Sequence, residues 1–321
     1  MKAIVQHRYG GADALSFGEV PRPEAGDRDL LVQVVAAGVD RGALHFMTGR
    51  PYLMRLGTGL RTPKRDVPGV SFAGRVEAVG RDVTGFRPGD EVYGAAKGTY
   101  AEYVAAPAGK VAHKPQGLTF EEAAVLPYAS FAAVQAVRDH ARVGSADHVL
   151  VVGATGAVGS IAVQVAKALG AEVTGVSGPR GLDLARSLGS DHVVDYSEED
   201  FTDGSLRYDV ILDVFGRTPV RRLRRALTPR GRLMIVGGEG DRWIGGMHRQ
   251  LGATLLSPFV RQRLGFFVAK ENAETLEAIN DLVTTGRVSP VLDRSYPLIE
   301  AGEAVRRLED GSGTGRIVLI I

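Results

Sequence analysis

The chain has 321 residues, of which 44% are hydrophobic and 24% charged, and its formal net charge is +2. This length and composition predict a soluble protein of two domains, and the near-balanced charge gives no reason to expect nucleic acid or a membrane as a partner. The chain has no cysteine, which excludes disulfides, thiolate metal sites and a cysteine nucleophile. Because it shows neither a signal peptide nor an apolar run of ~18 residues, we expect a cytoplasmic protein.

The first third of the chain predicts a β-rich domain. A strand is expected over residues 30–36, and the alternating, glycine-interrupted pattern of residues 70–79 predicts a bent strand in a small barrel. Shorter strands are expected at 91–93, 100–104 and 111–114. Repeated glycine and proline residues between positions 41 and 68 predict a long loop, and because loops of that length are usually functional, we expect it to form a wall of a substrate cleft.

The stretch VLVVGATGAVG, residues 149–159, predicts a buried strand, a glycine-rich turn and the start of a helix. In this context the turn is typical of a dinucleotide-binding site, where helix N–H groups and the helix dipole bind phosphates. Ala154 departs from the strict glycine pattern, and a tight turn without a ligand is the alternative. The expected cofactor contacts are Gly153, Ala154, Thr155, Gly156, Ala157, Val158 and Gly159.

Around this stretch, strands alternate with helices. Thr119, with Glu122 three residues later, predicts a capped helix, and a helical run over 123–137 is interrupted by Pro127. With the strand at 149–152, strands expected at 172–176, 192–194, 208–212, 232–236 and 254–256 predict a doubly wound parallel sheet of six strands. A helix at 273–285, an extended segment at 291–296, a helix at 301–308 and a strand at 316–321 are expected to return to the first domain.

Four segments together carry a family resemblance: DLLVQVVAAGVD, PGVSFAGRVEAVGRDVTGFRPGDEVYG, VLVVGATGAVGSIAVQVAKALGAEV and SGTGRIVL. In this order they resemble the medium-chain dehydrogenase/reductase superfamily, in its zinc-free quinone-oxidoreductase (zeta-crystallin-like) branch. The resemblance implies an α/β protein with a GroES-like β-barrel catalytic domain over residues 1–120 and 273–321. It also implies a Rossmann NADP-binding domain over residues 121–272, and hydride transfer in a cleft between the two domains.

The zinc ligands of the metal-dependent relatives are missing at the matching positions. Those relatives carry a cysteine after the first long strand and a later Gly-His-Glu triplet, where this chain has Val39-Asp40 and Gly69-Val70-Ser71. A zinc site needs three or four such ligands, so we expect no metal. Without a Lewis acid, reduction of a quinone, enone or enal is favoured over alcohol dehydrogenation, and a zinc-free alcohol dehydrogenase is the second candidate.

The end of the second sheet strand indicates the cofactor. NAD-dependent enzymes place an acidic residue there, whereas this chain has Ser177 followed by Arg180. A hydroxyl and a guanidinium can bind a 2′-phosphate, so we expect NADPH rather than NADH. The resemblance places Tyr196 at the adenine end of the cofactor. The alternatives are a solvated loop charge for Arg180 and half-core packing for Tyr196.

Three further segments are assigned to the nicotinamide end. Val214-Phe215-Gly216 and Val236-Gly237-Gly238 follow the fourth and fifth strands, at the strand ends where α/β sheets bind ligands. Phe267 and Val268 resemble the family segment that passes near the nicotinamide. Ordinary loop turns are the alternative for the glycines. Ala132 stands where many relatives carry a threonine, so one expected polar contact is missing.

The candidates for substrate handling are Asp40, His45 and Tyr52, on the loop predicted after Gly38. Hydride transfer to an enone leaves an enolate, and His45 or Tyr52 could supply the hydrogen-bond donor or the proton that it needs. The alternatives are a turn or cap role for Asp40, a plain loop histidine for His45, and protonation by water.

Four arginines, Arg221, Arg222, Arg224 and Arg225, alternate with apolar residues at helical spacing and are interpreted as the solvated face of a helix rather than a nucleic-acid site.

The strand expected at 254–256 carries no lysine, proline or glycine, so this edge is expected to pair with a second copy in a symmetric homodimer. The alternative is a monomer whose edge is covered by residues 258–267. The alternative to an enzyme is an NADPH-binding sensor or scaffold protein without turnover.

Overall fold

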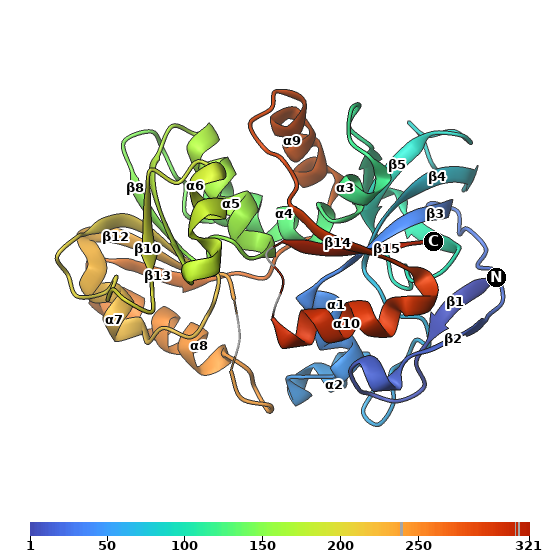
Figure 1. The fold of residues 1–321 in the computed structure, drawn as a ribbon, viewed down its shortest axis with the longest axis horizontal. Helices are drawn as coiled ribbons and strands as arrows, with labels where there is room; N and C mark the ends of the chain where they lie inside the picture. Colours follow the sequence, from blue (N-terminus) through green and yellow to red (C-terminus); the bar gives the residue numbers. More distant parts are fainter. Residues whose placement is uncertain (238–239, 312, 314) are drawn as a thin grey trace. The chain divides into compact units, whose positions relative to one another are not determined.

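The structure, a computed structural model, describes residues 1–237, 240–311, 313 and 315–321 (Figure 1). The chain forms two compact units. The first consists of Met1–Phe131, Glu271–Thr284 and Pro290–Ile321, and the second of Ala132–Lys270 and Thr285–Ser289. The C-terminal segments therefore belong mainly with the N-terminal unit. Within the described residues, no helix is long and apolar enough to cross a membrane.

The units divide after residues 131 and 270, rather than at the expected boundaries of 120 and 272. Residues after 120 pack on the first unit: a Cβ at Gly38 would lie 2.7 Å from the Ala124 carbonyl oxygen, and the Val125 carbonyl accepts a hydrogen bond from Arg316. Lys270 and Ser289 are the residues at which the chain leaves the second unit. A glutamine side chain bonds both the backbone N–H and the backbone carbonyl of each. Gln135 bonds Lys270 at 3.0 and 2.7 Å, and Gln164 bonds Ser289 at 2.8 and 3.1 Å.

The first unit is built on antiparallel strands. Its helices and strands are β1 (Lys2–Val5), β2 (Ser16–Glu19), β3 (Asp29–Val39), α1 (Arg41–Thr48), α2 (Arg55–Thr58), β4 (Ser71–Val79), β5 (Glu91–Ala95), β6 (Tyr103–Pro107), β7 (Val111–His113), α3 (Phe120–Ala124), α9 (Ala273–Thr284), β14 (Leu292–Pro297), α10 (Ala301–Asp310) and β15 (Arg316–Ile320). Within the described residues, a larger sheet runs β14-β15-β3-β4-β5-β7, with β6 also on β3, and a second sheet pairs β1 with β2. The pairs are antiparallel except β14 with β15.

Strand β3 is the centre of this sheet because its alternate apolar residues bury one face. Leu30, Val32 and Val34 are all buried in the core of the first unit. The glycine-interrupted strand expected beside it is β4, and its pairing with β3 contains two register shifts. A Cβ at Gly74 would lie 2.1 Å from the Gln33 carbonyl oxygen, so the close approach of the two strands requires glycine there.

The segment expected to be a long loop over residues 41–68 is partly helical, so that prediction is wrong. Asp40 caps the N-terminus of α1, and Gly49, with φ of +57°, ends the helix in the left-handed region. A second short helix, α2, follows a 3₁₀ turn at Tyr52–Met54. The glycines and prolines of this stretch therefore separate short helices. The capping box predicted for Thr119 and Glu122 is present at the start of α3.

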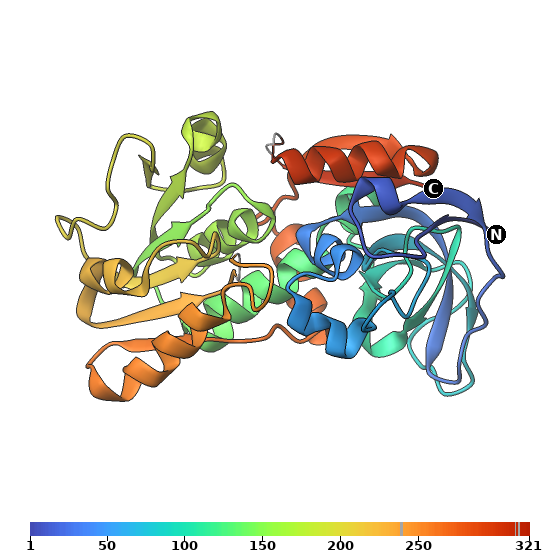
Figure 2. The same cartoon turned by 90° about the horizontal axis from the view of Figure 1, so that it is seen from below.

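The second unit is built on a parallel sheet. Its elements are α4 (Pro127–Val134, which begins in the first unit), a π-helical turn (Gln135–His140), β8 (His148–Val152), α5 (Ala157–Ala168), β9 (Glu172–Ser177), α6 (Leu182–Ser187), β10 (His192–Asp195), β11 (Tyr208–Asp213), α7 (Val220–Ala226), β12 (Leu227–Ile235), α8 (Met247–Leu256) and β13 (Arg263–Phe266). Within the described residues its strand order is β10-β9-β8-β11-β12-β13, and every pair is parallel. Strand order reverses at β8, which places α5 and α6 on one face and α7 and α8 on the other (Figures 1 and 2). The predicted doubly wound sheet is confirmed.

The sixth strand of this sheet is not the one predicted. Residues 254–256 end helix α8, and the edge strand is β13. The short apolar run fits a helix as well as a strand, because α8 buries Ala253 on one side and leaves Leu255 exposed on the other. The edge predicted for self-association is therefore a helix face.

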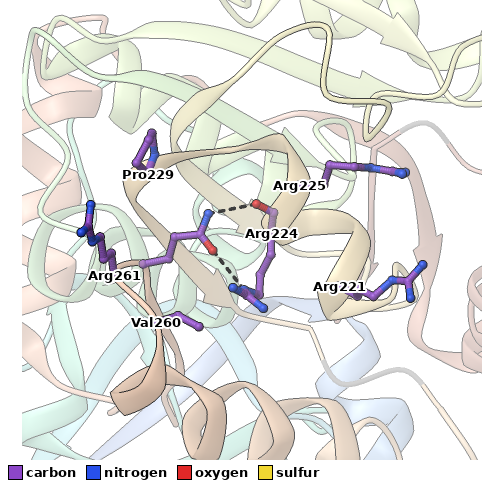
Figure 3. Close-up of a pocket in the computed structure, with 7 residues that line it drawn as sticks. Arg221, Arg224, Arg225, Pro229, Val260 and Arg261 are labelled. Carbon is purple, nitrogen blue, oxygen red and sulfur yellow. Dashed lines mark hydrogen bonds between the residues drawn. The ribbon is translucent and has the colours of Figure 1, made fainter.

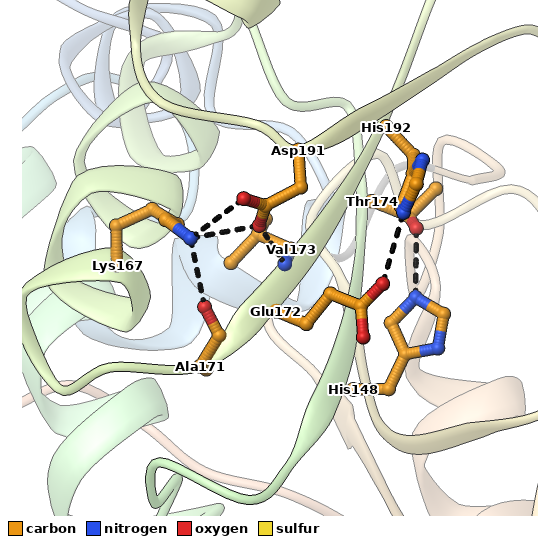
Figure 4. A network of polar contacts seen from close by, with 8 residues as sticks. All are labelled: His148, Lys167, Ala171, Glu172, Val173, Thr174, Asp191 and His192. Atoms are coloured by element: carbon orange, nitrogen blue, oxygen red, sulfur yellow. Dashed lines mark hydrogen bonds and ion pairs between the residues drawn. The ribbon is translucent and has the colours of Figure 1, made fainter.

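A polar network ties together the amino-terminal ends of β8, β9 and β10 (Figure 4). His148 bonds the Thr174 hydroxyl at 3.0 Å, and His192 bonds Glu172 at 2.9 Å. Lys167 pairs with Asp191 at 2.8 Å, and Asp191 also accepts the Val173 N–H at 2.7 Å. These contacts hold the amino-terminal ends of the three strands together. The glycine-rich turn lies at the opposite, carboxyl-terminal ends of the strands.

Candidate functional site

The glycine-rich turn joins the carboxyl end of β8 to α5. Gly153 has φ of +88°, and the N–H groups of Gly153 and Ala154 both donate to the Val176 carbonyl at 3.0 Å. A Cβ at Gly159 would lie 2.0 Å from the Gly153 carbonyl oxygen, so only glycine lets α5 cross the turn this closely. Gly156 is the N-cap of α5 and offers its first turn no side-chain oxygen. A helix N-terminus without a side-chain cap is a suitable place for a phosphate.

The residues within this turn differ in what they can offer a ligand. Ala154 is fully buried, and its Cβ would lie only 3.0 Å from a Cβ placed at Gly175. Its methyl group therefore packs into the sheet. Ala157 and Val158 begin α5. Thr155 bonds the Ser177 hydroxyl at 2.8 Å, which links the turn to the end of the next strand.

The end of β9 is followed by a cation and has no carboxylate at the expected position, and an aromatic ring that follows β10 lies beside it. Ser177 is buried, and a Cβ at Gly181 would lie 2.1 Å from its hydroxyl oxygen. Arg180 is exposed on the 3₁₀ turn that follows. The Tyr196 N–H donates to the Ser177 carbonyl at 3.2 Å, and the Tyr196 side chain, 59% exposed, lies beside Gly178. The predicted 2′-phosphate and adenine residues are therefore neighbours in the structure.

The predicted nicotinamide segments lie at the carboxyl ends of β11 and β12. The N–H groups of Val214 and Phe215 both donate to the Val152 carbonyl at 3.1 Å, which attaches this loop to the end of β8. A Cβ at Gly153 would lie 3.3 Å from Phe215, and a Cβ at Gly237 would lie 1.9 Å from the Val214 carbonyl oxygen. The structure thus brings the two loops and the glycine-rich turn into contact.

The remaining members of this group are placed less tightly. The Val236 N–H donates to the Asp213 carbonyl at 3.0 Å. Phe267 stacks on His140 with 4.3 Å between ring centroids, and Val268 is 80% exposed. Gly238 lies outside the described residues. Ala132, at the position of the missing threonine, is the first residue of the second unit.

A buried ion pair holds the loop that follows β11. Asp213 is fully buried, pairs with Arg249 of α8 at 2.5 Å, and accepts the Gly216 N–H at 3.0 Å. Arg249 also donates to the Gly216 and Thr218 carbonyls. Removing one partner of such a pair would leave an uncompensated buried charge, so this clamp fixes the loop strongly. The sequence analysis did not single out either residue.

In the first unit, Asp40 lies at the start of α1 among buried polar groups. Its Oδ1 accepts the Ala43 N–H at 2.8 Å, and its Oδ2 accepts the Ser71 hydroxyl at 3.4 Å. Burial raises the pKa of Asp40 to about 6, although these hydrogen bonds and the charge of Arg316 act to lower it. Burial also lowers the pKa of Arg316 to about 10. The cap role considered for Asp40 is confirmed, and its catalytic role stays a prediction.

His45 and Tyr52 follow Asp40 along the same segment. The His45 Nδ1 lies 2.9 Å from the Arg50 carbonyl oxygen, which orients the imidazole. The guanidinium of Arg55 lies 4.6 Å from the Tyr52 ring centroid and 4.3 Å from that of Tyr9. Both candidate side chains are half-buried.

Sequence reasoning missed Tyr128 as a candidate proton donor. A Cβ at Gly42 would lie 2.2 Å from the Tyr128 Cζ, so the phenol ring lies against the first turn of α1. Burial, together with the negative charges of Asp40 and Glu271, raises the pKa of the Tyr128 phenol. The phenol is therefore protonated at neutral pH and can donate a proton or a hydrogen bond. No sequence motif marks this position.

Metal ligands are not gathered in the part of the chain that the structure describes. Within residues 1–237, 240–311, 313 and 315–321, no group of three or more histidine and acidic side chains could hold a metal ion. Of the residues in the segments that match zinc ligands in metal-dependent relatives, Asp40 and Ser71 bond to each other, and Val70 stands in place of the histidine.

Family models match both parts of the chain. Residues 26–116 match the alcohol dehydrogenase GroES-like domain, and residues 188–319 match the zinc-binding dehydrogenase domain. The first match agrees with the predicted GroES-like domain, and the predicted combination with a Rossmann-type parallel sheet is confirmed.

Comparisons with whole proteins agree with these matches. The chain is 31% identical to 2-methylene-furan-3-one reductase of Solanum lycopersicum, over 99% of this chain and 79% of that protein. It is 29% identical to the chloroplastic NADPH-dependent alkenal/one oxidoreductase of Arabidopsis thaliana, with the same coverage. The quinone oxidoreductase structure from Coxiella burnetii matches with a TM-score of 0.87 at 26% identity, over 100% of this chain and 99% of that one.

The raised pKa of Asp40 predicts how its replacement changes the pH dependence of stability. An acid whose pKa is higher in the folded state than in the unfolded state destabilises the fold as pH rises from about 4 to about 6. Asp40→Asn keeps a good N-cap but removes this titration. Relative to the wild type, the variant should therefore gain unfolding free energy on going from about pH 4 to about pH 7, measured by denaturant titration at each pH. Parallel pH profiles of the two proteins would show that Asp40 does not titrate in this way.

Proposed function

Because the chain belongs to the medium-chain dehydrogenase/reductase family, we propose that it is an NADPH-dependent oxidoreductase that reduces a quinone or an α,β-unsaturated carbonyl compound without a metal. The observation that carries the proposal is the end of β9, where Ser177 bonds Thr155 of the glycine-rich turn, the exposed Arg180 follows on the next turn, and no acidic residue stands at the expected position. The names of the reductases to which the chain is similar support the acceptor class.

The residues of the second unit fit a dinucleotide. The glycine-rich turn and the N-terminus of α5 would bind the pyrophosphate, because the glycines allow close approach and the helix dipole favours a negative charge. Arg180 and Ser177 would bind the 2′-phosphate, and Tyr196 would lie against the adenine. The loops at 214–216 and 236–237, with Phe267 and Val268, would contact the nicotinamide end. When bound, NADPH supplies the hydride.

The first unit supplies candidates for the proton. Reduction of a conjugated carbonyl leaves an oxyanion, which is stabilised by a hydrogen-bond donor and then protonated. His45, Tyr52 and Tyr128 are the candidate donors of this unit, and water is the other proton source. Asp40 positions α1, on which His45 lies, through its cap on Ala43.

The proposal that no metal takes part rests on the ligand set. The chain has no cysteine, and the segments that match zinc ligands carry a capping aspartate, a valine and a serine. A conjugated double bond is already polarised, so its reduction needs less help from a Lewis acid than the oxidation of a simple alcohol.

Turnover with a panel of acceptors tests the proposed reaction. Purified protein should oxidise NADPH in the presence of at least one quinone, enone or enal, as followed by loss of absorbance of the reduced nicotinamide. The rate should be unchanged after exhaustive chelation, and metal analysis should find no stoichiometric zinc. NADPH binding without oxidation by any acceptor would favour a sensor or scaffold role. Turnover of alcohols alone would favour the alcohol dehydrogenase candidate.

Arg180 tests the cofactor assignment. Arg180→Ala should raise the KM for NADPH by about tenfold or more and leave that for NADH nearly unchanged, because only NADPH carries the 2′-phosphate. Arg186→Ala is the matched control, since Arg186 is exposed on the next helix and pairs with Asp183 at 2.8 Å. A wild type that prefers NADH, or a variant that loses both cofactors equally, would contradict the assignment.

We also propose that the protein forms a homodimer through the edge of the parallel sheet, with the interface corrected from the predicted strand. The edge strand is β13, and the adjoining α8 and the turn after it expose Leu251, Leu255 and Phe259, the last of them 84% exposed. Exposed apolar side chains next to a sheet edge are typical of association surfaces.

Sedimentation tests the dimer and its interface separately. The wild type should sediment at about twice the chain mass of 34.1 kDa, and Leu255→Lys should shift it toward that mass. Leu206→Lys is the control, because Leu206 is 56% exposed and precedes β11, which β12 separates from the edge strand β13. A monomeric wild type would contradict the dimer, and an intact dimer of the Leu255 variant would contradict this interface alone.

A further inference from the structure

Arginines from two separate segments of the second unit line a hollow in its surface (Figure 3). The hollow has a volume of about 360 Å³. Its lining comes from α7, from the start of β12 and from the segment before β13, and consists of Arg221, Arg224, Arg225, Pro229, Val260, Arg261 and Gln262. Arg261 also lines an adjoining hollow whose other residues are Arg230, Arg232 and Arg263.

This hollow is distinct from the residues assigned to NADPH. It lies where α7 ends and where β12 and β13 begin, so it is at the amino-terminal edge of the sheet. The glycine-rich turn and the loops after β11 and β12 lie at the carboxyl-terminal edge. A ligand in the hollow would therefore not compete with the proposed cofactor.

Two of the four guanidinium groups of the hollow are oriented by neutral oxygens. Arg224 donates through Nε to the Gln262 Oε1 at 3.0 Å, and Gln262 donates back to the Arg224 carbonyl at 2.9 Å, as Figure 3 shows. Arg225 donates through Nε to the Thr202 carbonyl at 2.9 Å. The Asp203 carboxylate acts on Arg225 through its charge but is bonded to Ser205. Among the described residues, Arg221 and Arg261 have no ion-pair partner, and the lining of the hollow contains no acidic side chain.

One arginine of the same helix, Arg222, shows the ordinary arrangement for this side chain. Arg222 pairs with Asp200 at 2.6 Å and bonds the Thr202 hydroxyl at 2.9 Å. Helix α7 thus has one arginine with a carboxylate partner, whereas its three arginines that line the hollow form no ion pair with a described residue. Several positive charges around one concave surface repel one another. A bound anion would attract each of them, so the net electrostatic energy of the group would become favourable.

We propose that this hollow binds a small anion that carries a di- or triphosphate chain. Four guanidinium groups supply more positive charge than one carboxylate can balance, and arginine forks match phosphate oxygens in bidentate geometry. The volume is sufficient for a phosphate chain, and binding of a polymer is an outcome of the test below. The lining contains no aromatic ring on which a base could stack, so recognition rests on the phosphate chain.

Calorimetric titration with inorganic tripolyphosphate tests the site. The titration is made at about 0.15 M salt, where interactions between distant surface charges are largely screened, and with NADPH at saturation to occupy the cofactor's phosphate subsites. The wild type should show one saturable site. The double variant Arg221→Gln/Arg261→Gln should lose at least about tenfold in affinity, because each removed charge-assisted contact is worth about that factor. Neither arginine bonds another described residue, so the double variant should fold.

Arg222→Gln is the matched control, because it removes the same charge from the same helix outside the hollow; its affinity for tripolyphosphate should equal that of the wild type. A nucleoside triphosphate titrated in the same way separates the sources of the phosphate chain. An affinity equal to that for tripolyphosphate would mean that the hollow recognises the phosphates alone, and a higher affinity would mean that it also contacts the nucleoside. The proposal is overturned by absence of saturable binding, by equal binding to the double variant, by sulfate binding as tightly as tripolyphosphate, or by duplex DNA binding that displaces tripolyphosphate.

Discussion

At the carboxyl ends of the parallel strands, the loops are held by backbone contacts that leave no room for a side chain. A Cβ at Gly159 would lie 2.0 Å from the Gly153 carbonyl oxygen, and a Cβ at Gly237 would lie 1.9 Å from that of Val214. Backbone hydrogen bonds from Val214 and Phe215 to the end of β8 hold the same segments together. The turn and the two loops therefore form one preorganised unit, and the buried sheet beneath them fixes its shape.

Much of the second unit could be predicted from the sequence because its elements are long, apolar and bounded by turn residues. The residues 254–256 were misassigned because a short apolar run fits a strand or the end of an amphipathic helix, and only the burial of Ala253 against the exposure of Leu255 decides between them. The helix after Asp40 was also missed. There the signals were present, with an aspartate N-cap and Gly49 at the helix end, but they were outweighed by the surrounding glycines and prolines.

The site shows which contacts a sequence cannot reveal. The turn at 153–159 could be recognised because its residues are adjacent in the chain. The group around Asp40 could not, since Ser71, Tyr128 and Arg316 come from three distant segments that only the fold brings together. The same holds for the arginine-lined hollow: the run at 221–225 is visible in the sequence, whereas Arg261 joins it through the pairing of β12 with β13. A sequence pattern predicts contacts between residues that are close in the chain. A charge cluster assembled from distant segments has no such pattern in the sequence.

The close contacts at the carboxyl edge also determine where this protein can diverge during evolution. Gly159 and Gly237 cannot accept a side chain unless the opposing carbonyl moves, which would disturb the neighbouring loop as well. Phe215 is different, because its backbone is fixed by the Val152 carbonyl while its side chain is 46% exposed. Substitutions there alter the surface of the site and leave the turn in place. Descendants of this chain are therefore expected to change their ligand contacts through such exposed positions, with the glycine framework retained.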